Sequence, residues 1–296
     1  MLALDLGGTK AAAGVVDGGG RVLSFLVEPT RAEEGPERGL ARLFDLGRRA
    51  VHEAGHEVAA VGIAAGGPLD PERGILLAPL HLPGWRDVPV TAQAEAAFGL
   101  PAVLENDATA AAAGEFRYGA GRGRKSLVYL TLSTGVGGGV VVDGKLLRSR
   151  GNGGELGHVT VDWRGRECRG CGRLGCLEAY ASGTSIAERA REAGLNAATA
   201  ADVAAHAADG DPVAVAVWDE TVEALACGLV SLVNVFEPDV VVLGGGVSRT
   251  GEQLLGPVRE RVRLAAMGNA GDAEIVQSAL GDHVGVVGAA AVVQDD

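Results

Sequence analysis

The chain has 296 residues, 47% of them hydrophobic, and carries a formal net charge of −12. This length suits one large domain or two ordinary ones, and the acidic balance argues against binding to the polyanionic backbone of nucleic acids. No apolar run reaches the roughly 18 residues of a membrane span, and the start MLALDLGGTK does not resemble a secretory signal, so we expect a cytoplasmic protein with no nucleic-acid or membrane partner.

The first half of the chain predicts a glycine-connected hairpin followed by alternating helices and strands. Residues 2–6 (LALDL) and 11–17 (AAAGVVD) are apolar strands joined by the turn GGTK. Residues 35–55 have helical spacing of leucine and phenylalanine, and an alanine-rich helix starts near Asp107. Further strands are predicted at 58–64 and 102–105.

The second half of the chain starts with what looks like a copy of that hairpin. Residues 127–143 again run from an apolar strand through a glycine turn into a second apolar strand, about 125 residues after the first copy. Strands 240–243 and 274–277 follow, with helices at 184–194, 211–238 and 250–266 between them. Cys227, in the apolar helix 211–238, is expected in the core.

Alternating strands and helices predict an α/β fold with partly parallel sheets. We place one domain at 1–114, joined by a C-terminal helix at about 284–296, and a larger second domain at 115–283.

Three glycine turns that follow apolar strands are suited to holding a nucleotide. Glycine leaves no Cβ in the way of a phosphate, and backbone N–H groups can bind the anion. Asp5, at the end of the first strand, is placed to hold a hydrated Mg²⁺. One such turn is commonly an ordinary hairpin, but two matched copies and a third turn favour nucleotide binding. The candidate nucleotide residues are Asp5, Gly7, Gly8, Thr9, Lys10, Ser133, Thr134, Gly135, Gly137, Gly244, Gly245 and Gly246.

Polar residues stand between the strand 102–105 and the alanine-rich helix. Asp107 has two interpretations from the sequence, as the helix N-cap or as a base that accepts a proton from an attacking hydroxyl, and the local pattern does not choose between them. Asn106 could orient a sugar hydroxyl, and Gly66 and Gly67 could bring backbone close to the same ligand.

Three of the four cysteines lie within RECRGCGRLGCLEAY (166–180), and the first of them, Cys168, comes ten residues after His158. A disulfide is disfavoured in a reducing compartment. One imidazole and three thiolates suit tetrahedral zinc, which we favour over a redox CxxC pair. The predicted ligands of this structural zinc clip are His158, Cys168, Cys171 and Cys176. The clip would hold Glu155 and Glu178 in one rigid loop system, where their carboxylates could bind sugar hydroxyls.

Taken together, DLGGTK, END, STGVGGG, GELGH and CGRLGCLEAYASG resemble the ROK sugar kinases and repressors. The resemblance implies an actin-like ATPase (ribonuclease H-like) fold with two α/β domains around a cleft, ATP with Mg²⁺, and a homodimer or homotetramer. It implies Asp107 as the catalytic base, sugar contacts from Gly67, Asn106, Glu155, His158 and Glu178, and the same zinc ligands.

The function expected from this resemblance is phosphorylation of a hexose 6-hydroxyl by ATP, most simply glucose to glucose 6-phosphate. PLHLPGW (79–85) replaces the PNLPGW of many glucose-specific members. An N-acylhexosamine kinase, acting on N-acetylmannosamine or N-acetylglucosamine, is therefore the alternative. A sugar-sensing repressor-like binding protein is a distant third, because the first phosphate turn begins at residue 7 and leaves no room before it for a helix-turn-helix.

Overall fold

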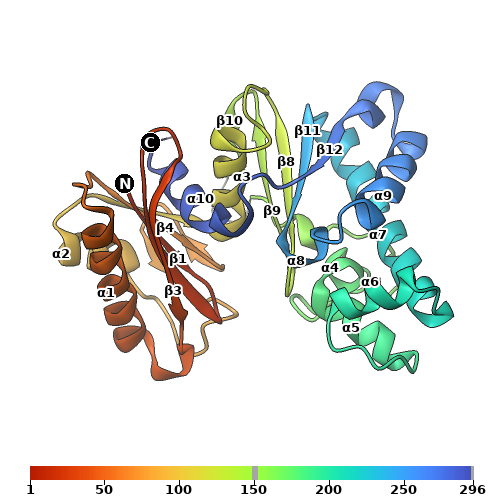
Figure 1. The fold of residues 1–296 in the computed structure, drawn as a ribbon, viewed down its shortest axis with the longest axis horizontal. Coiled ribbons are helices and arrows are strands. Elements are labelled where there is room, and N and C mark those ends of the chain that lie inside the picture. The colour runs from red at the N-terminus through yellow and green to blue at the C-terminus, as the bar shows by residue number, and fades with distance from the viewer. Residues whose placement is uncertain (149–152, 295–296) are drawn as a thin grey trace. The chain divides into compact units, whose positions relative to one another are not determined.

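The computed structural model describes residues 1–148 and 153–294. The chain forms two compact units (Figure 1): unit 1 comprises residues 1–123, 146–154 and 279–296, and unit 2 comprises 124–145 and 155–278. We placed the boundary after residue 114, which falls inside helix α3 (Asp107–Tyr118). The whole helix belongs to unit 1 because its alanines pack against the C-terminal helix of that unit. Among the described residues, no helix is long and apolar enough to span a bilayer.

Unit 1 contains a five-stranded mixed sheet in the order β3-β2-β1-β4-β7. The first three strands form an antiparallel meander, whereas β1, β4 and β7 run parallel. Strand β1 is an almost continuous apolar run because helices cover both faces of the sheet. The strands are β1 (Leu2–Leu6), β2 (Lys10–Val16), β3 (Val22–Pro29), β4 (Val61–Ala65) and β7 (Ala102–Asn106), with a small β5 (Leu69–Asp70) and β6 (Ile75–Leu76) hairpin beside them.

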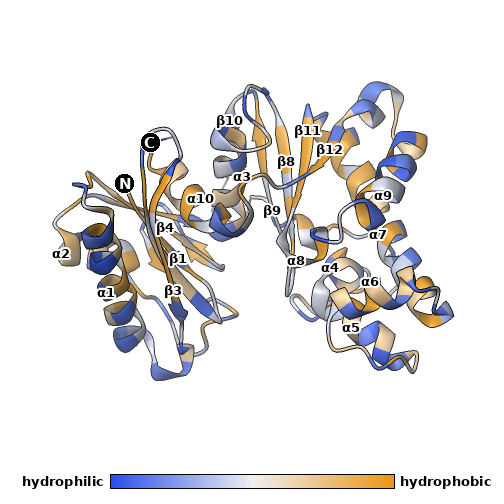
Figure 2. Cartoon of the chain, in the orientation of Figure 1, coloured by the Kyte–Doolittle hydropathy of each residue, from blue (hydrophilic) through white to orange (hydrophobic). Residues whose placement is uncertain are grey.

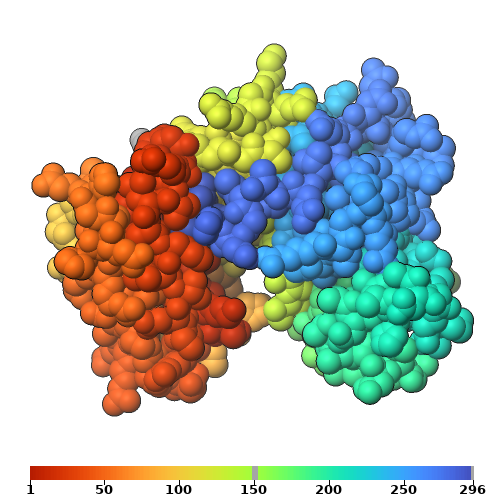
Figure 3. Space-filling view, in the orientation of Figure 1, coloured from red at the N-terminus to blue at the C-terminus, as the bar shows by residue number. Residues whose placement is uncertain are grey.

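Two pairs of helices sandwich this sheet (Figure 1). Helices α1 (Pro36–Ala54) and α2 (Val90–Phe98) cover one face, and α3 and α10 (Val284–Val292) cover the other. Helix α1 begins with a proline in its first turn and turns its hydrophilic residues outward (Figure 2), as expected for an amphipathic surface helix. Figure 3 shows the C-terminal segment, in dark blue, lying against the red N-terminal strands. Short 3₁₀ turns, η1 (Ala32–Glu34) and η4 (Gly281–His283), complete unit 1.

Unit 2 contains a second five-stranded sheet in the order β10-β9-β8-β11-β12. Strands β8 and β9 are antiparallel, and β8, β11 and β12 are parallel. The same strand order, with one antiparallel neighbour and two successive parallel neighbours beside the central strand, therefore occurs in both units, which confirms the internal repeat predicted from the two hairpins. The strands are β8 (Leu127–Leu132), β9 (Val136–Val142), β10 (Lys145–Leu146), β11 (Val240–Gly244) and β12 (Glu274–Gln277).

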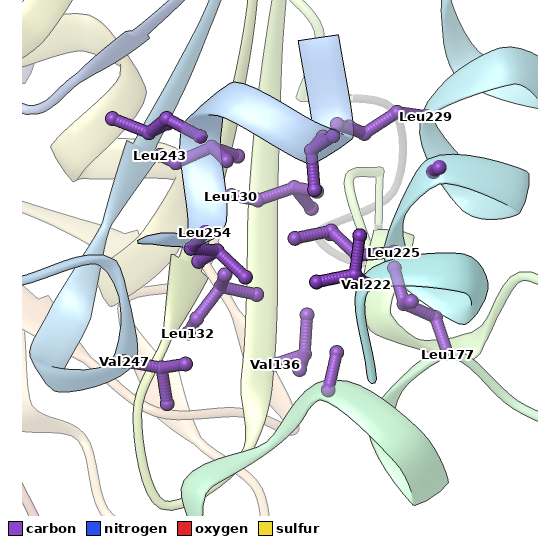
Figure 4. Close-up of a cluster of buried hydrophobic side chains, with 14 of the residues drawn as sticks. Leu130, Leu132, Val136, Leu177, Val222, Leu225, Leu229, Leu243, Val247 and Leu254 are labelled. Atoms are coloured by element: carbon purple, nitrogen blue, oxygen red, sulfur yellow. The ribbon is translucent and has the colours of Figure 1, made fainter. Parts of the chain in front are cut away.

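The core of unit 2 lies between its sheet and the long helix α7 (Pro212–Phe236). Leucines of β8 and β11 point toward Val222, Leu225 and Leu229 of α7 (Figure 4), and all of these side chains are buried. Cys227, which we expected in this core, is exposed, because it lies on the opposite side of α7 from the sheet. The other elements are η2 (Leu156–His158), α4 (Glu178–Ala181), α5 (Gly183–Glu192), α6 (Ala200–Ala208), α8 (Gly245–Ser248), α9 (Glu252–Ala265) and η3 (Gly268–Asp272).

Candidate functional site

The carboxyl ends of three parallel strands place polar residues side by side in unit 1. The register pairs Asp5 of β1 with Ala64 of β4, and it pairs Ala65 with Asn106 of β7. Gly66 follows β4 directly, so it lies beside Asn106 and Asp107; a Cβ on Gly66 would lie 3.9 Å from Asp107 Oδ2. Ligands of open α/β sheets bind outside this edge.

The helix cap at this edge is Asn106. Its Oδ1 accepts hydrogen bonds from the backbone N–H groups of Ala108 at 3.0 Å and Thr109 at 3.1 Å. Asp107 is the first residue of α3, and its Oδ1 accepts from the Ala108 N–H at 2.8 Å. Capping therefore does not depend on Asp107, so the N-cap interpretation of this aspartate is wrong. The Asn106 amide Nδ2 is turned toward Gly67, 3.8 Å from where a Cβ of that glycine would lie.

Two carboxyl groups at this edge have raised pKa values. Burial, and then the charge of Asp107, raises the pKa of Asp5 to about 7. Asp107 keeps solvent access, but nearby protein displaces enough water to raise the pKa of its carboxyl above the ordinary value. The Ala108 N–H and the positive charge of His81 oppose that rise. Carboxylates whose charges are destabilised in this way are typical of cation and catalytic sites.

The first glycine turn, Gly7 to Lys10, is held from two sides. The Gly7 N–H donates to the Lys10 carbonyl at 3.1 Å, and the buried Thr30 hydroxyl donates to the Gly7 carbonyl at 2.6 Å. A Cβ on Gly8 would lie 2.5 Å from the Cβ of His81, so only glycine fits there. The turn therefore has a fixed backbone and leaves the side chains of Thr9 and Lys10 exposed.

The other two glycine turns lie together at one edge of the sheet of unit 2. Strand β8 runs into Ser133, Thr134 and Gly135, and Gly137 is in β9. Gly244, at the end of the neighbouring parallel β11, pairs with Thr131, which brings Gly244 to Gly246 next to this turn. Gly245 has φ +82°, and a Cβ there would lie 2.4 Å from the Leu132 carbonyl oxygen. At this edge the glycines expose backbone without side chains, which suits the binding of a nucleotide.

The cysteine cluster of unit 2 brings all four predicted ligands together. One ligand atom from each of His158, Cys168, Cys171 and Cys176 lies within 4.8 Å of every other. Cys168 Sγ is 3.7 Å from His158 Nδ1, and Cys171 Sγ is 3.4 Å from Cys176 Sγ. Ligands of tetrahedral zinc stand about 3.8 Å apart when the Zn–S distance is about 2.3 Å, so the donor set fits a metal ion. The longer Cys168–Cys171 spacing does not remove Cys168 from the cluster.

Glu178 links this cluster to the glycine turn that follows β8. Its Oε1 lies 3.3 Å from Cys168 Sγ, and its Oε2 accepts from the Val136 N–H at 3.0 Å. Glu155 is exposed, with one carboxylate oxygen 4.0 Å from His158 Nε2. Both glutamates therefore lie close to the cluster, as the sequence predicted.

The candidate residues consequently form two sets, one in each unit. Those of unit 1 gather at the carboxyl edge of its sheet, and those of unit 2 gather around the cysteine cluster and the two glycine turns. Sequence reasoning missed Thr30 and the closeness of His81 to Gly8 and Asp107. The insertion Leu80-His81 in PLHLPGW was the available signal for His81; no local pattern marked Thr30.

Comparisons with known proteins cover the entire chain. The profile of the ROK family matches residues 1–296. The chain belongs to the ROK family. It is 39% identical to a glucokinase of Thermotoga maritima over 100% of this chain and 97% of the relative, and 35% identical to an N-acetylmannosamine kinase of Salmonella typhimurium over 100% and 98%.

Solved ROK structures have the same fold. A ROK hexokinase from Thermus thermophilus matches with 41% identity and a TM-score of 0.86, covering 100% of this chain and 99% of that one. A ROK glucokinase from Streptomyces griseus, in complex with glucose and AMPPNP, matches with 37% identity and a TM-score of 0.83 over the same shares. The predicted α/β fold of the actin-like ATPase class is thereby confirmed for this ROK protein.

Proposed function

We propose that this ROK protein is an ATP-dependent hexose kinase that phosphorylates the 6-hydroxyl of glucose. The observation that carries the proposal is the strand–helix junction, where Asn106 caps α3 and leaves Asp107 as a carboxylate not needed for capping. Full-length similarity to proteins named glucokinase supports the choice of sugar.

In this mechanism Asp107 accepts the proton of the sugar hydroxyl as its oxygen attacks the terminal phosphorus of ATP. The bond from that phosphorus to the bridging oxygen of ADP breaks, and its electrons leave with ADP. General-base assistance of this kind contributes about 10²–10⁴-fold to a rate. The raised pKa of Asp107 makes it a better proton acceptor than an ordinary aspartate.

The glycine turns are proposed to bind the nucleotide. Gly7, Gly8, Thr9 and Lys10 in unit 1, and Ser133, Thr134, Gly135 and Gly137 in unit 2, would hold phosphates through backbone N–H groups and short polar side chains. Gly244 to Gly246 would face the adenosine. Asp5 would hold hydrated Mg²⁺, which neutralises phosphate charge when bound; its raised pKa marks a carboxylate that a cation would stabilise.

Each unit, taken by itself, carries residues that we propose for sugar binding. Gly66 and Gly67 offer backbone, Asn106 offers its amide Nδ2, and Asp107 meets the 6-hydroxyl. In unit 2, the carboxylates of Glu155 and Glu178 and the imidazole of His158 would bind further hydroxyls.

We further propose that the four-residue cluster holds structural zinc through His158, Cys168, Cys171 and Cys176. With the Cys168 thiolate held as a zinc ligand, the Glu178 carboxylate that now lies against it would be available for sugar binding. The two proposed roles of His158 use different ring nitrogens. Nδ1 faces the sulfurs and would bind the metal, whereas Nε2 lies on the side of Glu155 and would bind a sugar hydroxyl.

The alternative substrate is an N-acylhexosamine, favoured by similarity to N-acetylmannosamine kinases. A coupled assay of ADP release with glucose, mannose, fructose, N-acetylglucosamine and N-acetylmannosamine distinguishes the two. The highest kcat/KM is expected with glucose. A higher value with either N-acetyl sugar would replace glucose as the substrate, and no turnover with any sugar would reject the kinase. The homodimer or homotetramer stays a prediction, which light scattering can test.

A further inference from the structure

Glu115 is a fully buried carboxylate near the end of helix α3 that the proposed mechanism does not use. Its Oε2 accepts hydrogen bonds from the backbone N–H groups of Ala120 at 2.8 Å and Ala279 at 3.3 Å. Its Oε1 accepts from the Leu280 N–H at 3.0 Å. A buried charge is costly unless it is hydrogen-bonded, so these N–H groups and the carboxylate depend on one another.

The residues that Glu115 holds come from two segments where the chain passes between the units. Unit 1 ends its first segment at Gly123, three residues after Ala120, and resumes at Ala279 after Ser278. We call residues 119–126 the first connector and residues 277–280 the second connector. The chain also passes between units at Lys145–Leu146 and at Gly154–Glu155. One side chain therefore fastens the unit 1 ends of the first and second connectors to each other.

The unit 2 ends of both connectors are held separately. Asp239 Oδ2 accepts from the N–H groups of Lys125 at 2.7 Å and Ser126 at 3.0 Å. The Ser278 N–H donates to the Leu243 carbonyl of β11 at 2.9 Å. In the first connector, Gly123 and Arg124 lie between the residues held by Glu115 and those held by Asp239, and Gly123 has φ +80°. In the second connector, the corresponding point is the peptide between Ser278 and Ala279.

We propose that Glu115 is a positioning residue that joins the two connectors into one hinge, which bends at Gly123–Arg124 and at Ser278–Ala279. The consequence for catalysis rests on the proposed kinase function. Helix α3 carries Asp107 at its first residue and Glu115 near its last turn. Beyond the first connector, β8 leads directly into the phosphate turn at Ser133. The chain between the base and that turn thus passes through this hinge, and Glu115 limits how the two can move.

The test replaces the carboxylate with its near-isosteric amide, Glu115→Gln, in the full-length chain. The amide keeps one acceptor oxygen but turns an NH₂ group toward backbone N–H donors. Without ligands, hydrogen exchange of both connectors is expected to become about tenfold faster. At saturating glucose and ATP, kcat is expected to fall about tenfold, because small misplacements of reacting groups are costly.

The matched control is Ser24→Ala, which removes buried hydrogen bonds of the same unit away from the connectors. The Ser24 hydroxyl accepts from the Val15 N–H at 3.2 Å and donates to the Ala50 carbonyl at 2.7 Å. This variant is expected to lower Tm while connector exchange and kcat stay unchanged. Glu115→Asp, which keeps the charge but shortens its reach, is expected to behave like Glu115→Gln.

Unchanged hydrogen exchange of the connectors in both Glu115 variants would overturn the proposal that Glu115 joins them into one hinge. Faster exchange with unchanged kcat and KM would overturn the positioning role. If neither variant folds, hydrogen exchange in the unmodified chain decides. The proposal is refuted if the amides of Ala279 and Leu280 are no better protected than the amide of Arg124. Failure of the unmodified chain to phosphorylate any sugar would reject the proposed function, while the exchange measurement still tests the joint.

Discussion

The adjacent residues Asn106 and Asp107 separate helix capping from catalysis, so substitutions at the two positions should have different effects. Asn106→Ala removes an oxygen that accepts from two backbone N–H groups of α3. Asp107→Asn keeps an oxygen in place for the Ala108 N–H, which Asp107 Oδ1 accepts at 2.8 Å. We therefore expect the first variant to lose stability and the second to lose turnover.

The expected magnitudes follow from these contacts. Loss of an N-cap costs about 1 kcal/mol, which for a unit of roughly 150 residues lowers Tm by about 2–4 °C. Asp107→Asn should not lower Tm at neutral pH. The folded protein raises the pKa of this carboxyl, so the wild type is favoured most at low pH and loses that advantage as pH rises through the raised pKa. Loss of the base should reduce kcat about 10²–10⁴-fold.

Differential scanning calorimetry and the coupled ADP-release assay measure the two effects on the same samples. Asn106→Ser is the control for capping, because serine caps helices well but lacks the amide; it should keep Tm and raise the KM for sugar. Near-normal kcat in Asp107→Asn would refute the role of base. A Tm loss in Asp107→Ala, which removes the oxygen altogether, equal to that of Asn106→Ala would show that Asp107 caps the helix after all.

Three further variants test the zinc clip, the charge near the base and the third glycine turn. Cys176→Ser should reduce bound zinc, measured by mass spectrometry of the metal, and lower Tm with it; full zinc content would reject the clip. His81→Ala removes a charge that holds down the pKa of Asp107, so the acidic limb of the kcat/KM profile should move to higher pH, and a shift to lower pH would contradict this. Gly245→Ala forces a Cβ to within 2.4 Å of the Leu132 carbonyl oxygen at a positive φ, which should cost at least about 1–2 kcal/mol and raise the KM for ATP. Unchanged unfolding and KM would mean that this turn tolerates a side chain.

The sequence predicted the elements that are buried and therefore consist mainly of apolar residues. Strands β1, β8 and β11 are short, mostly apolar runs that end at or just before a glycine or a small polar residue, and each was predicted. Strand β3 was missed because it mixes serine and glutamate with apolar residues, and all but one of its positions are half-buried or exposed. Helix α2 follows Pro89 and has no side-chain cap, so it lacks a start signal. Helix α6 does carry one, since Thr199 and Asp202 form a capping box that was overlooked.

For the site, residue types and spacing indicated the candidates but not their contacts. The four residues of the proposed zinc clip could be predicted to cluster because cysteine is rare in this chain and the four lie close in sequence. The distinction between Asn106 as cap and Asp107 as a further carboxylate needed hydrogen-bond geometry. Glu115 could not have been predicted, because its partner Leu280 is 165 residues away and donates only a backbone N–H, which no sequence pattern marks.

The internal repeat allows the carboxyl ends of the parallel strands to be compared between the two units. In both units the central strand leads into a glycine turn, and the adjacent parallel strand also leads into glycines: Gly66 follows β4, and Gly244 is the last residue of β11. The third parallel strand differs. In unit 1, β7 ends at Asn106 and α3 begins with Asp107, whereas in unit 2, β12 ends at Gln277 and the chain leaves the unit after Ser278. Equivalent positions of a duplicated sheet thus carry the proposed base in one copy and the second connector in the other, and Glu115, from the helix that starts at that base, bonds to the connector. A single helix, α3, therefore carries the proposed base at its first residue and, near its last turn, the carboxylate that holds the second connector.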